Sequence, residues 1–481
     1  MLRRILVSRG QLKAKNDLAC LILAAGKGTR MYSARAKMLH QVLGVPLVSY
    51  PVERALELHA SPIVAVLGHQ RAEVEKALVA RHGQGTVTVV EQTEQKGTGN
   101  AVRLGLAPLR AWEGTILILY GDVPLLSRET LTALVKKSRK GGVLAILTAE
   151  LADPHGYGRV IRDGKGCVVG VVEEKDATED QRRIREVNAG IYAAPAAFLR
   201  QATARLSPRN AQGELYLTDI IAKAATGIGV ASVSVSAEEM AGINDRQQLI
   251  AVERILCRRI VGGWMKHATF RDPDAVLIEA SVTIDADAEI GRNVVLRGRT
   301  KIGAGARIDD GCILSDTEVG AGAVLLPYTV TSQSIVGPGA KVGPFAHLRP
   351  GTELGPDVHV GNYVETKKTR LGRGSKANHL TYLGDTIIGE GVNVGAGTIT
   401  CNYNGYEKRQ TIIEDGAFIG SDTQLVAPVR VGKRAVVAAG ATITEDIRDG
   451  ALAITRAPLK QVDGYADKVA QRYAEKAAAK R

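Results

Sequence analysis

The chain has 481 residues, with 63 Lys and Arg against 50 Asp and Glu, and only 4% of its residues are aromatic. This length predicts two or three domains, and the few aromatic side chains argue against a nucleic-acid surface built on base stacking. The net charge of +13 suits nucleic acid, anionic membranes or phosphorylated small molecules, and the scattered basic residues fit a phosphate-handling enzyme at least as well. No apolar run approaches the ~20 residues of a membrane span.

The cysteines and the amino-terminal segment bear on the cellular compartment. Five cysteines lie far apart and form no CxxC pair, which argues against a disulfide framework or a structural zinc site. Residues 1–16 are basic, but their apolar run is too short for a secretory signal. We therefore predict a basic N-terminal tail on a cytoplasmic protein.

Residues 17–246 alternate apolar runs with segments of helical periodicity. Strands are predicted at "LACLILAAG", "PIVAVLGH", "TVTVVEQ", "TILILYGD" and "VLAILTAEL". Helical spacing appears in "PLVSYPVERALELHA" and "RAEVEKALVARH". Apolar strands separated by helices predict a Rossmann-like, doubly wound α/β domain, whose ligand lies beyond the carboxyl ends of the strands.

Residues 247–267 are predicted to form a linker helix. Asn244 or Asp245 would cap its start, and Gly262-Gly263 would end it.

Residues 268–481 change to a period of six and end in a basic tail. Aliphatic residues recur at Ile278, Ile284 and Ile290, and the register continues to Leu314, resumes at Val336 and appears again from Ile413 to Ile443. This period predicts a solenoid of parallel strands, with three hexapeptides per triangular coil and about nine coils. A β-sandwich with coincidental spacing is the alternative. Residues 380–411 interrupt the period, and their polar part "TCNYNGYEKRQT" is predicted to leave the coil as a loop.

The stretch "LILAAGKGTRMYSARAK" at residues 21–37 follows the first predicted strand. Gly26 and Gly28 allow backbone N–H groups to approach an anion, and Arg30 and Lys37 add positive charge. The stretch is neither a Walker loop nor a dinucleotide fingerprint. L-x-x-G-x-G-T-R-M with a downstream Lys resembles the signature of the sugar nucleotidyltransferases. That family usually has Pro before the lysine, whereas this chain has Ala36.

The resemblance implies a UTP and UDP-sugar site that holds Mg²⁺. "EQTEQKGTGNA", "LYGDVPL", "HGYGRV", "VEEKDAT", "REVNAGIY" and "AGINDR" match its parts in order. It implies that Arg30 and Lys37 are catalytic and that Asp122 and Asn244 are the metal ligands. The implied nucleotide and sugar contacts are Leu23, Ala24, Ala25, Gly26, Lys37, Gln92, Gly97, Thr98, Tyr120, Gly121, Asp122, Gly158, Glu173, Asn188 and Asn244.

The six-residue period resembles the left-handed β-helix acyltransferases. The nucleotidyltransferase signature, the six-residue period and the motifs "KANHLTYLGD" and "GAGTITCNYNG" occur in one chain. This combination resembles the family of bifunctional N-acetylglucosamine-1-phosphate uridyltransferase/glucosamine-1-phosphate N-acetyltransferase enzymes. The resemblance implies that His379 is the general base of acetyl transfer, and that Lys408 in the loop contributes. It implies glucosamine-1-phosphate contacts at Arg349, Lys367, Tyr382 and Asn393. The implied acetyl-CoA contacts are Ala396, Asn402, Tyr403, Ser421, Ala439 and Arg456.

We therefore expect a homotrimer that acetylates glucosamine-1-phosphate with acetyl-CoA and then transfers a uridylyl group from UTP. Two alternatives stay open. One is a hexose-1-phosphate nucleotidyltransferase whose prism is regulatory or architectural. The other is a basic scaffold associated with nucleic acid, which would bind a duplex with a steep salt dependence.

Overall fold

The computed structural model describes residues 17–479, so the predicted tail at residues 1–16 lies outside the described residues. The chain divides into two compact units between Ile260 and Val261. This division falls inside helix α8 (Arg246–Trp264), within the segment predicted as a linker at residues 247–267. Among residues 17–479, no helix combines the length and the apolar character that crossing a bilayer requires.

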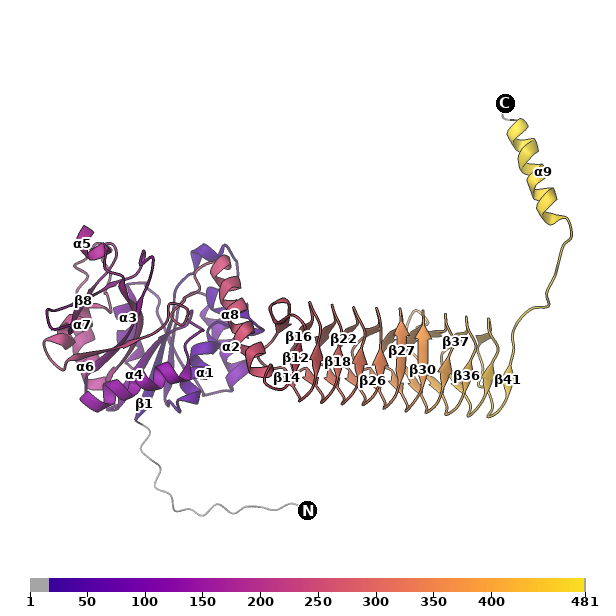
Figure 1. Ribbon diagram of the computed structural model, residues 1–481, viewed down its shortest axis with the longest axis horizontal. Helices are drawn as coiled ribbons and strands as arrows, with labels where there is room; N and C mark the ends of the chain where they lie inside the picture. Colours follow the sequence, from indigo (N-terminus) through magenta and orange to yellow (C-terminus); the bar gives the residue numbers. More distant parts are fainter. Residues whose placement is uncertain (1–16, 480–481) are drawn as a thin grey trace, which may run out of the picture. The chain divides into compact units, whose positions relative to one another are not determined.

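The first unit is built on a nine-stranded sheet with the strand order β11-β7-β10-β6-β1-β4-β5 and a side hairpin of β8 and β9 (Figure 1). All neighbours along this path are parallel except β10, which runs antiparallel to β6 and β7. The five predicted strands are confirmed as β1, β4, β5, β6 and β7. The bounds are β1 (Leu18–Ala24), β4 (Ile63–Leu67), β5 (Thr88–Glu91), β6 (Thr115–Tyr120), β7 (Leu144–Glu150), β8 (Arg159–Arg162), β9 (Val168–Val172), β10 (Glu186–Pro195) and β11 (Val230–Ser234).

Helices cover both faces of this sheet, because alternate side chains of each strand point to opposite faces. In β1, Cys20 and Ile22 join one core with residues of α1, α2 and α4, whereas Leu21 joins a second core with residues of α3, α6 and α7. The sheet is therefore doubly wound, as predicted. The helices are α1 (Ser49–Glu57), α2 (Arg71–His82), α3 (Thr98–Gly105), α4 (Arg128–Gly141), α5 (Glu179–Arg182), α6 (Ala196–Ala204) and α7 (Asp219–Ala225).

Helix α8 ends later than predicted, and its start shows which of Asn244 and Asp245 caps it. Asp245 is the capping residue, because its Oδ1 accepts a hydrogen bond of 2.8 Å from the Gln248 N–H. The helix does not stop at Gly262-Gly263 but continues to Trp264. There the carbonyl of Val261 accepts a hydrogen bond of 2.9 Å from the Met265 N–H, so the glycines do not break the backbone ladder.

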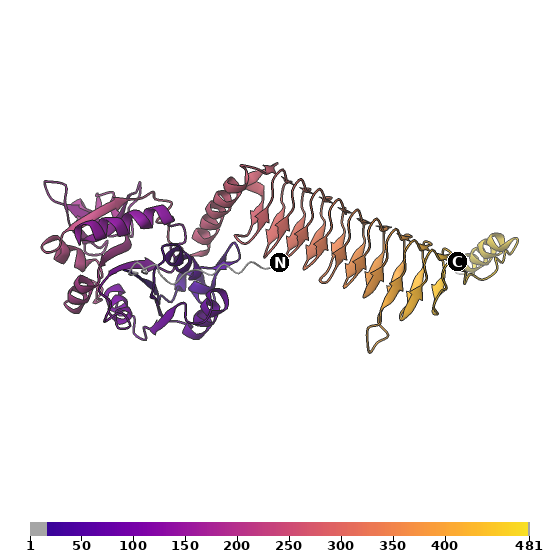
Figure 2. The same cartoon turned by 90° about the horizontal axis from the view of Figure 1, so that it is seen from below.

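The second unit is a left-handed parallel β-helix with three sheets of 11, 10 and 9 strands (Figures 1 and 2). Each strand pairs in parallel with its equivalent one coil later, as β13 (Leu277–Ile278) does with β16 (Val295–Arg297). The 10-stranded sheet runs from β13 to β40 (Thr442–Ile443), so nine coils separate its first strand from its last. The predicted solenoid is confirmed, and the sandwich alternative is wrong.

The period of six holds because its aliphatic side chains fill the prism. Those named in the prediction are at most 4% exposed. The six-residue spacing is broken after Leu314 because some coils have 17 residues instead of 18. Val319, Leu325 and Thr331 occupy the inward positions there. The hydroxyl of buried Thr331 shares a hydrogen bond of 2.8 Å with Thr317, which satisfies this polar group inside the prism.

The interruption of the prism is shorter than predicted. Residues 380–401 stay in the coils, as β31 (Tyr382–Gly384), β32 (Thr386–Ile388), β33 (Asn393–Val394) and β34 (Ile399–Cys401). Only the segment between β34 and β35 (Thr411–Ile413) leaves the stack, and it forms the projecting loop seen in orange to yellow in Figure 2. Coils shorter by one residue break the exact six-residue period in residues 380–401, so the period did not identify these strands. After the prism, helix α9 (Tyr465–Ala478) has no buried residue.

Candidate active sites

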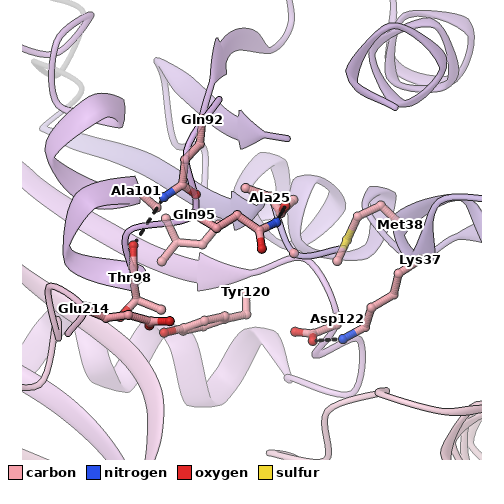
Figure 3. A pocket seen from close by; sticks show the side chains of 14 residues that line it. Ala25, Lys37, Met38, Gln92, Gln95, Thr98, Ala101, Tyr120, Asp122 and Glu214 are labelled. Carbon is pink, nitrogen blue, oxygen red and sulfur yellow. Dashed lines mark hydrogen bonds and ion pairs between the residues drawn. The ribbon is translucent and has the colours of Figure 1, made fainter. Parts of the chain in front are cut away.

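A cavity of about 300 Å³ opens where β1, β5 and β6 end (Figure 3). Parallel strands bring these carboxyl ends to one edge of the sheet, which is where the sequence predicted a ligand. The predicted residues that line it are Leu23, Ala24, Ala25, Gly26, Lys37, Gln92, Gly97, Thr98, Tyr120 and Asp122. The lining residues that the sequence reasoning missed are Met38, Gln95, Ala101 and Glu214.

Gln95 shows why such residues were missed. Its Nε2 donates a hydrogen bond of 3.0 Å to the carbonyl of Ala25 in the glycine turn (Figure 3). Arg246 makes a similar contact, because its Nε donates to the carbonyl of Met31 at 3.0 Å. Neither contact leaves a signal in the sequence, since any carbonyl is an acceptor and only the fold brings these groups together.

Lys37 is a charged residue of the cavity lining. It begins the 3₁₀ helix η2 (Lys37–Leu39), and its side chain is 7% exposed. Its Nζ donates to Asp122 Oδ2 at 2.5 Å, a contact visible in Figure 3, and to Asn244 Oδ1 at 3.0 Å. The oxygens of both predicted metal ligands therefore face a single positively charged group.

The glycine turn supports this placement of Lys37. Gly28 has a φ of +63°, and a Cβ at this position would lie 2.5 Å from the Cβ of Lys37. Only glycine combines this backbone conformation with room for the lysine stem. Arg30, in the 3₁₀ helix η1 (Thr29–Met31), is exposed and does not line the cavity.

The predicted sugar residues form a group of their own beside Tyr120. The Asn188 N–H donates to the Gly158 carbonyl at 2.9 Å, and a Cβ at Gly158 would lie 3.3 Å from Glu173 Oε2. Burial, followed by the charges of Glu173 and Asp122, raises the pKa of the Tyr120 phenol. Tyr120 therefore connects this group with the cavity. Gly121 lies behind the lining, since a Cβ there would lie 2.7 Å from Met38 Sδ.

Glu173 is a partly buried carboxylate with one close donor. Thr218 Oγ1 donates to its Oε1 at 2.9 Å. Burial raises the pKa of Glu173, the hydrogen bond from Thr218 lowers it, and the charges of Asp176 and Asp219 raise it further.

The second group of predicted residues lies on the prism around His379. This residue ends β30 (Lys376–His379) and is in register with Asn362, the last residue of β27 (His359–Asn362). His379 Nδ1 lies 3.2 Å from Asn362 Oδ1. An amide oxygen only accepts, so this contact places the hydrogen on Nδ1 and leaves the Nε2 lone pair available as a base.

Three positively charged side chains gather on the prism face formed by the 10-stranded sheet, whose strand β31 follows His379 in the chain. They lie near the carboxyl ends of its strands, at the edge of the face opposite His379. Arg349 follows β25 (His347–Leu348), Lys367 ends β28 (Glu365–Lys367), and Lys408 comes from the projecting loop. The pKa of Lys367 is lowered, first by the close approach of the Lys408 amine and its positive charge, and also by the charge of Arg349. Such a cluster suits a phosphate group.

Tyr382 and Asn393 occupy the coils next to these groups. Tyr382 begins β31 on the same face, in register with Glu365, which accepts a hydrogen bond of 2.7 Å from Arg349. Asn393 begins β33 and is in register with Lys376 on the strand of His379.

Four of the six predicted acetyl-CoA residues lie along one corner of the prism, in line with His379. Backbone hydrogen bonds join the successive corners, from Gly397 to Leu380, from Asp422 to Ala396 and from Gly440 to Ser421. Ala396, Ser421 and Ala439 therefore occupy equivalent positions in consecutive coils. Arg456 reaches the same corner, since its Cδ would lie 4.0 Å from a Cβ at Gly440.

The last two predicted residues are at the base of the projecting loop. Asn402 is buried, and its Nδ2 donates to Asp385 Oδ2 at 2.6 Å. Tyr403 is exposed, and its hydroxyl donates to the Gly405 carbonyl within the loop at 2.5 Å.

Comparison with known proteins agrees with both units. Residues 20–199 match the model of the MobA-like NTP transferase domain, residues 273–339 that of the GMPPB C-terminal domain, and residues 410–445 the bacterial transferase hexapeptide model with six repeats. The chain is 51% identical to the bifunctional protein GlmU of Anaeromyxobacter sp. (strain Fw109-5), an alignment that covers 95% of this chain and 93% of that relative. It is 51% identical to the bifunctional protein GlmU of Sorangium cellulosum (strain So ce56), over 95% of this chain and 97% of the relative. The chain therefore belongs to the family of bifunctional GlmU proteins, and it makes UDP-N-acetylglucosamine in two steps, an acetyl transfer and a uridylyl transfer.

Proposed function

We propose that the cavity around Lys37 is the site of uridylyl transfer and that the prism face between His379 and Lys367 is the site of acetyl transfer. The observation that carries the assignment is the arrangement of His379 and the three cations at opposite ends of one face. A glucosamine-1-phosphate lying along this face would place its amine near the base and its phosphate near Arg349, Lys367 and Lys408.

In acetyl transfer, the amine nitrogen attacks the thioester carbonyl of acetyl-CoA. His379 Nε2 takes the proton that the amine loses, the C–N bond forms, the C–S bond breaks, and the departing sulfur receives this proton to leave as the CoA thiol. Asn362 keeps the ring in the tautomer that this role requires. Acetyl-CoA would extend along the corner formed by Ala396, Ser421 and Ala439, near the charge of Arg456.

In uridylyl transfer, a phosphate oxygen of N-acetylglucosamine-1-phosphate attacks the α-phosphorus of UTP, and pyrophosphate leaves. Lys37 offsets the negative charge that develops on the phosphates, and Arg30 would approach them from the glycine turn when the nucleotide binds. Gln92, Gly97 and Thr98 would hold the uracil, whereas Glu173 and Asn188 would bind the sugar.

The residues of the cavity fit a magnesium ion. Asp122 and Asn244 offer the hard oxygen ligands that Mg²⁺ prefers, and both oxygens already face one cation, the ammonium group of Lys37. Mg²⁺ commonly binds through one or two protein oxygens, with water and substrate phosphates completing its coordination. When bound, the ion would supply Lewis-acid stabilisation of the phosphate charge.

The protein would act as a homotrimer in the cytoplasm. Tyr328, Phe345 and Tyr363 stack on a prism corner with ring centroids 5.3 and 5.5 Å apart, and all three are about half exposed. This apolar column continues to Leu380, the residue after His379, so a second copy of the chain packed there would border the acetyl-transfer site. Cys20 and Cys312 are buried thiols, which suits a reducing compartment.

Two substitutions test the assignment. His379→Ala should lower acetyl transfer by roughly a hundredfold or more and leave uridylyl transfer unchanged. Asp122→Ala should lower uridylyl transfer by roughly a hundredfold or more and leave acetyl transfer unchanged. Coupled assays of CoA and pyrophosphate release would measure both reactions.

Matched variants on the same units are Lys301→Ala, an exposed residue of the prism, and Asp180→Ala, whose side chain is 92% exposed. Both should retain full activity in both reactions. Loss of both reactions in a folded His379→Ala or Asp122→Ala protein would contradict the assignment of two independent sites.

A further inference from the structure

Gln70 makes two hydrogen bonds to the backbone of the loop that carries Lys37. Its Oε1 accepts from the Ala36 N–H at 2.6 Å, and its Nε2 donates to the Ala34 carbonyl at 2.7 Å. Gln70 stands at the start of α2 with a φ of +51°, and its side chain makes no capping hydrogen bond to that helix. The amide group therefore joins two loops more than thirty residues apart in the sequence rather than stabilising its own helix.

The contact fixes the backbone immediately before Lys37. Ala36 is 3% exposed, and its carbonyl accepts the hydrogen bond of 2.9 Å from the Leu39 N–H that closes η2. Its φ of −53° lies in the range that a proline ring would impose by itself, and its ψ of 139° is an extended value that proline also adopts. Alanine leaves φ free to rotate, so an external partner must hold this conformation.

We propose that Gln70 is a positioning residue for uridylyl transfer, which holds Ala36 so that Lys37 meets Asp122 and Asn244. The proposal rests on the proposed role of Lys37. Lys37 is held on one side by the glycine turn, where its stem lies against Gly28, and on the other by the Gln70 amide. Loss of either support would let the ammonium group move away from the nucleotide phosphates.

The geometry makes a specific prediction about proline at position 36. The ring Cδ would take the place of the Ala36 N–H hydrogen and meet Gln70 Oε1, which lies 2.6 Å from the nitrogen. Ala36→Pro should therefore displace the Gln70 side chain in the native background. In the Gln70→Ala background the space is open, and the ring itself would supply the missing constraint on φ.

A double-mutant cycle in the full-length protein tests the proposal. Gln70→Ala should lower kcat/KM for UTP by roughly tenfold, the size expected for losing these hydrogen bonds. Adding Ala36→Pro to Gln70→Ala should restore kcat/KM to within about threefold of the native value, whereas Ala36→Pro alone should lower it or leave it unchanged. The KM for the sugar phosphate and the rate of acetyl transfer should stay constant in all three proteins. Gln70→Glu keeps the acceptor for Ala36 but loses the donor to Ala34, so it should fall between the native protein and Gln70→Ala.

Two further variants separate the possible failures. Gln201→Ala, on the exposed side of α6, is the matched control and should retain native kinetics. The proposal is overturned if Gln70→Ala behaves like this control, or if Ala36→Pro changes kcat/KM by the same factor in both backgrounds. If Lys37→Ala keeps native uridylyl transfer, the proposed role of Lys37 fails as well. If Lys37→Ala is inactive and the cycle is additive, only the role of Gln70 fails.

Discussion

At the scale of single residues, Glu173 combines a proposed role in binding with a cost in stability. Its carboxyl group is partly buried, and Asp176 and Asp219 are the negative charges that oppose its ionisation. Thr218 offsets part of this by donating a hydrogen bond. A carboxylate in this position is unfavourable for folding but well placed to accept hydrogen bonds from sugar hydroxyl groups, as many binding residues are.

The pH dependence of stability follows from the sign of this shift. The pKa of Glu173 is higher in the folded chain than its ordinary value of 4.5, so the folded state binds the proton more tightly than the unfolded state does. The destabilisation is therefore present at neutral and alkaline pH and disappears as the pH falls through the folded pKa toward 4.5. Glu173→Gln should raise the thermal midpoint of the first unit at pH 8, and this gain should shrink steadily as the pH is lowered. Calorimetry across this range would measure it, with the exposed Glu113→Gln as a control, and a gain independent of pH would contradict the prediction.

At the scale of elements, the prism depends on its inward-pointing side chains. Each coil contributes three inward positions, and equivalent residues of successive coils are aligned by the parallel pairing, as Ile284 is with Ile302. Because each coil contacts only its neighbours, a cavity in one coil weakens a limited stretch of the solenoid. Threonine replaces an aliphatic residue at Thr331 and Thr366 without such a cost, since each hydroxyl shares a hydrogen bond with another threonine.

Ile302 and Lys301 offer a matched pair on one strand, β17 (Lys301–Ile302). Ile302 is 1% exposed, whereas Lys301 points outward. Ile302→Ala should destabilise the prism by about 2–5 kcal/mol, and Lys301→Ala should change its stability by less than about 0.5 kcal/mol. Thermal unfolding followed by circular dichroism would compare the two. Equal effects would contradict the inward placement of Ile302.

At the scale of the whole molecule, the two reactions belong to two compact units with separate cores. The proposed uridylyl site lies entirely within the first unit and the residues proposed for acetyl transfer within the second. Only the second unit presents the apolar column of Tyr328, Phe345, Tyr363 and Leu380 next to a proposed site. Assembly should therefore affect the two activities differently.

Dilution would reveal this difference. Light scattering at micromolar concentration should give three times the mass of one chain. As the protein is diluted until the assembly dissociates, acetyl transfer per chain should fall and uridylyl transfer per chain should stay constant. A parallel loss of both activities, or of neither, would contradict the shared acetyl-transfer site.

The sequence by itself determined the elements of both units. The strands of the first unit and the coils of the second follow from side-chain periods of two, 3.6 and six, and a period is a local property that the pattern of buried residues enforces. The motifs likewise predicted most residues that line the cavity where β1, β5 and β6 end, because glycine turns and strand ends occur at fixed places in an α/β sheet. By contrast, the sequence did not predict that residues 380–401 form coils of the prism, because coils shorter by one residue break the six-residue period there.

Only the tertiary structure decided which distant groups meet. Lys37 reaches Asp122 and Asn244 across 85 and 207 positions, and Gln70 reaches Ala36 across 34, because the order of the strands rather than any local pattern places these loops together. On the prism, the parallel pairing of successive strands aligns His379, Ala396, Ser421 and Ala439, although the coils between them differ in length. Hydrogen bonds of this kind depend on positions within a few tenths of an ångström, and that precision arises only when the whole chain has packed.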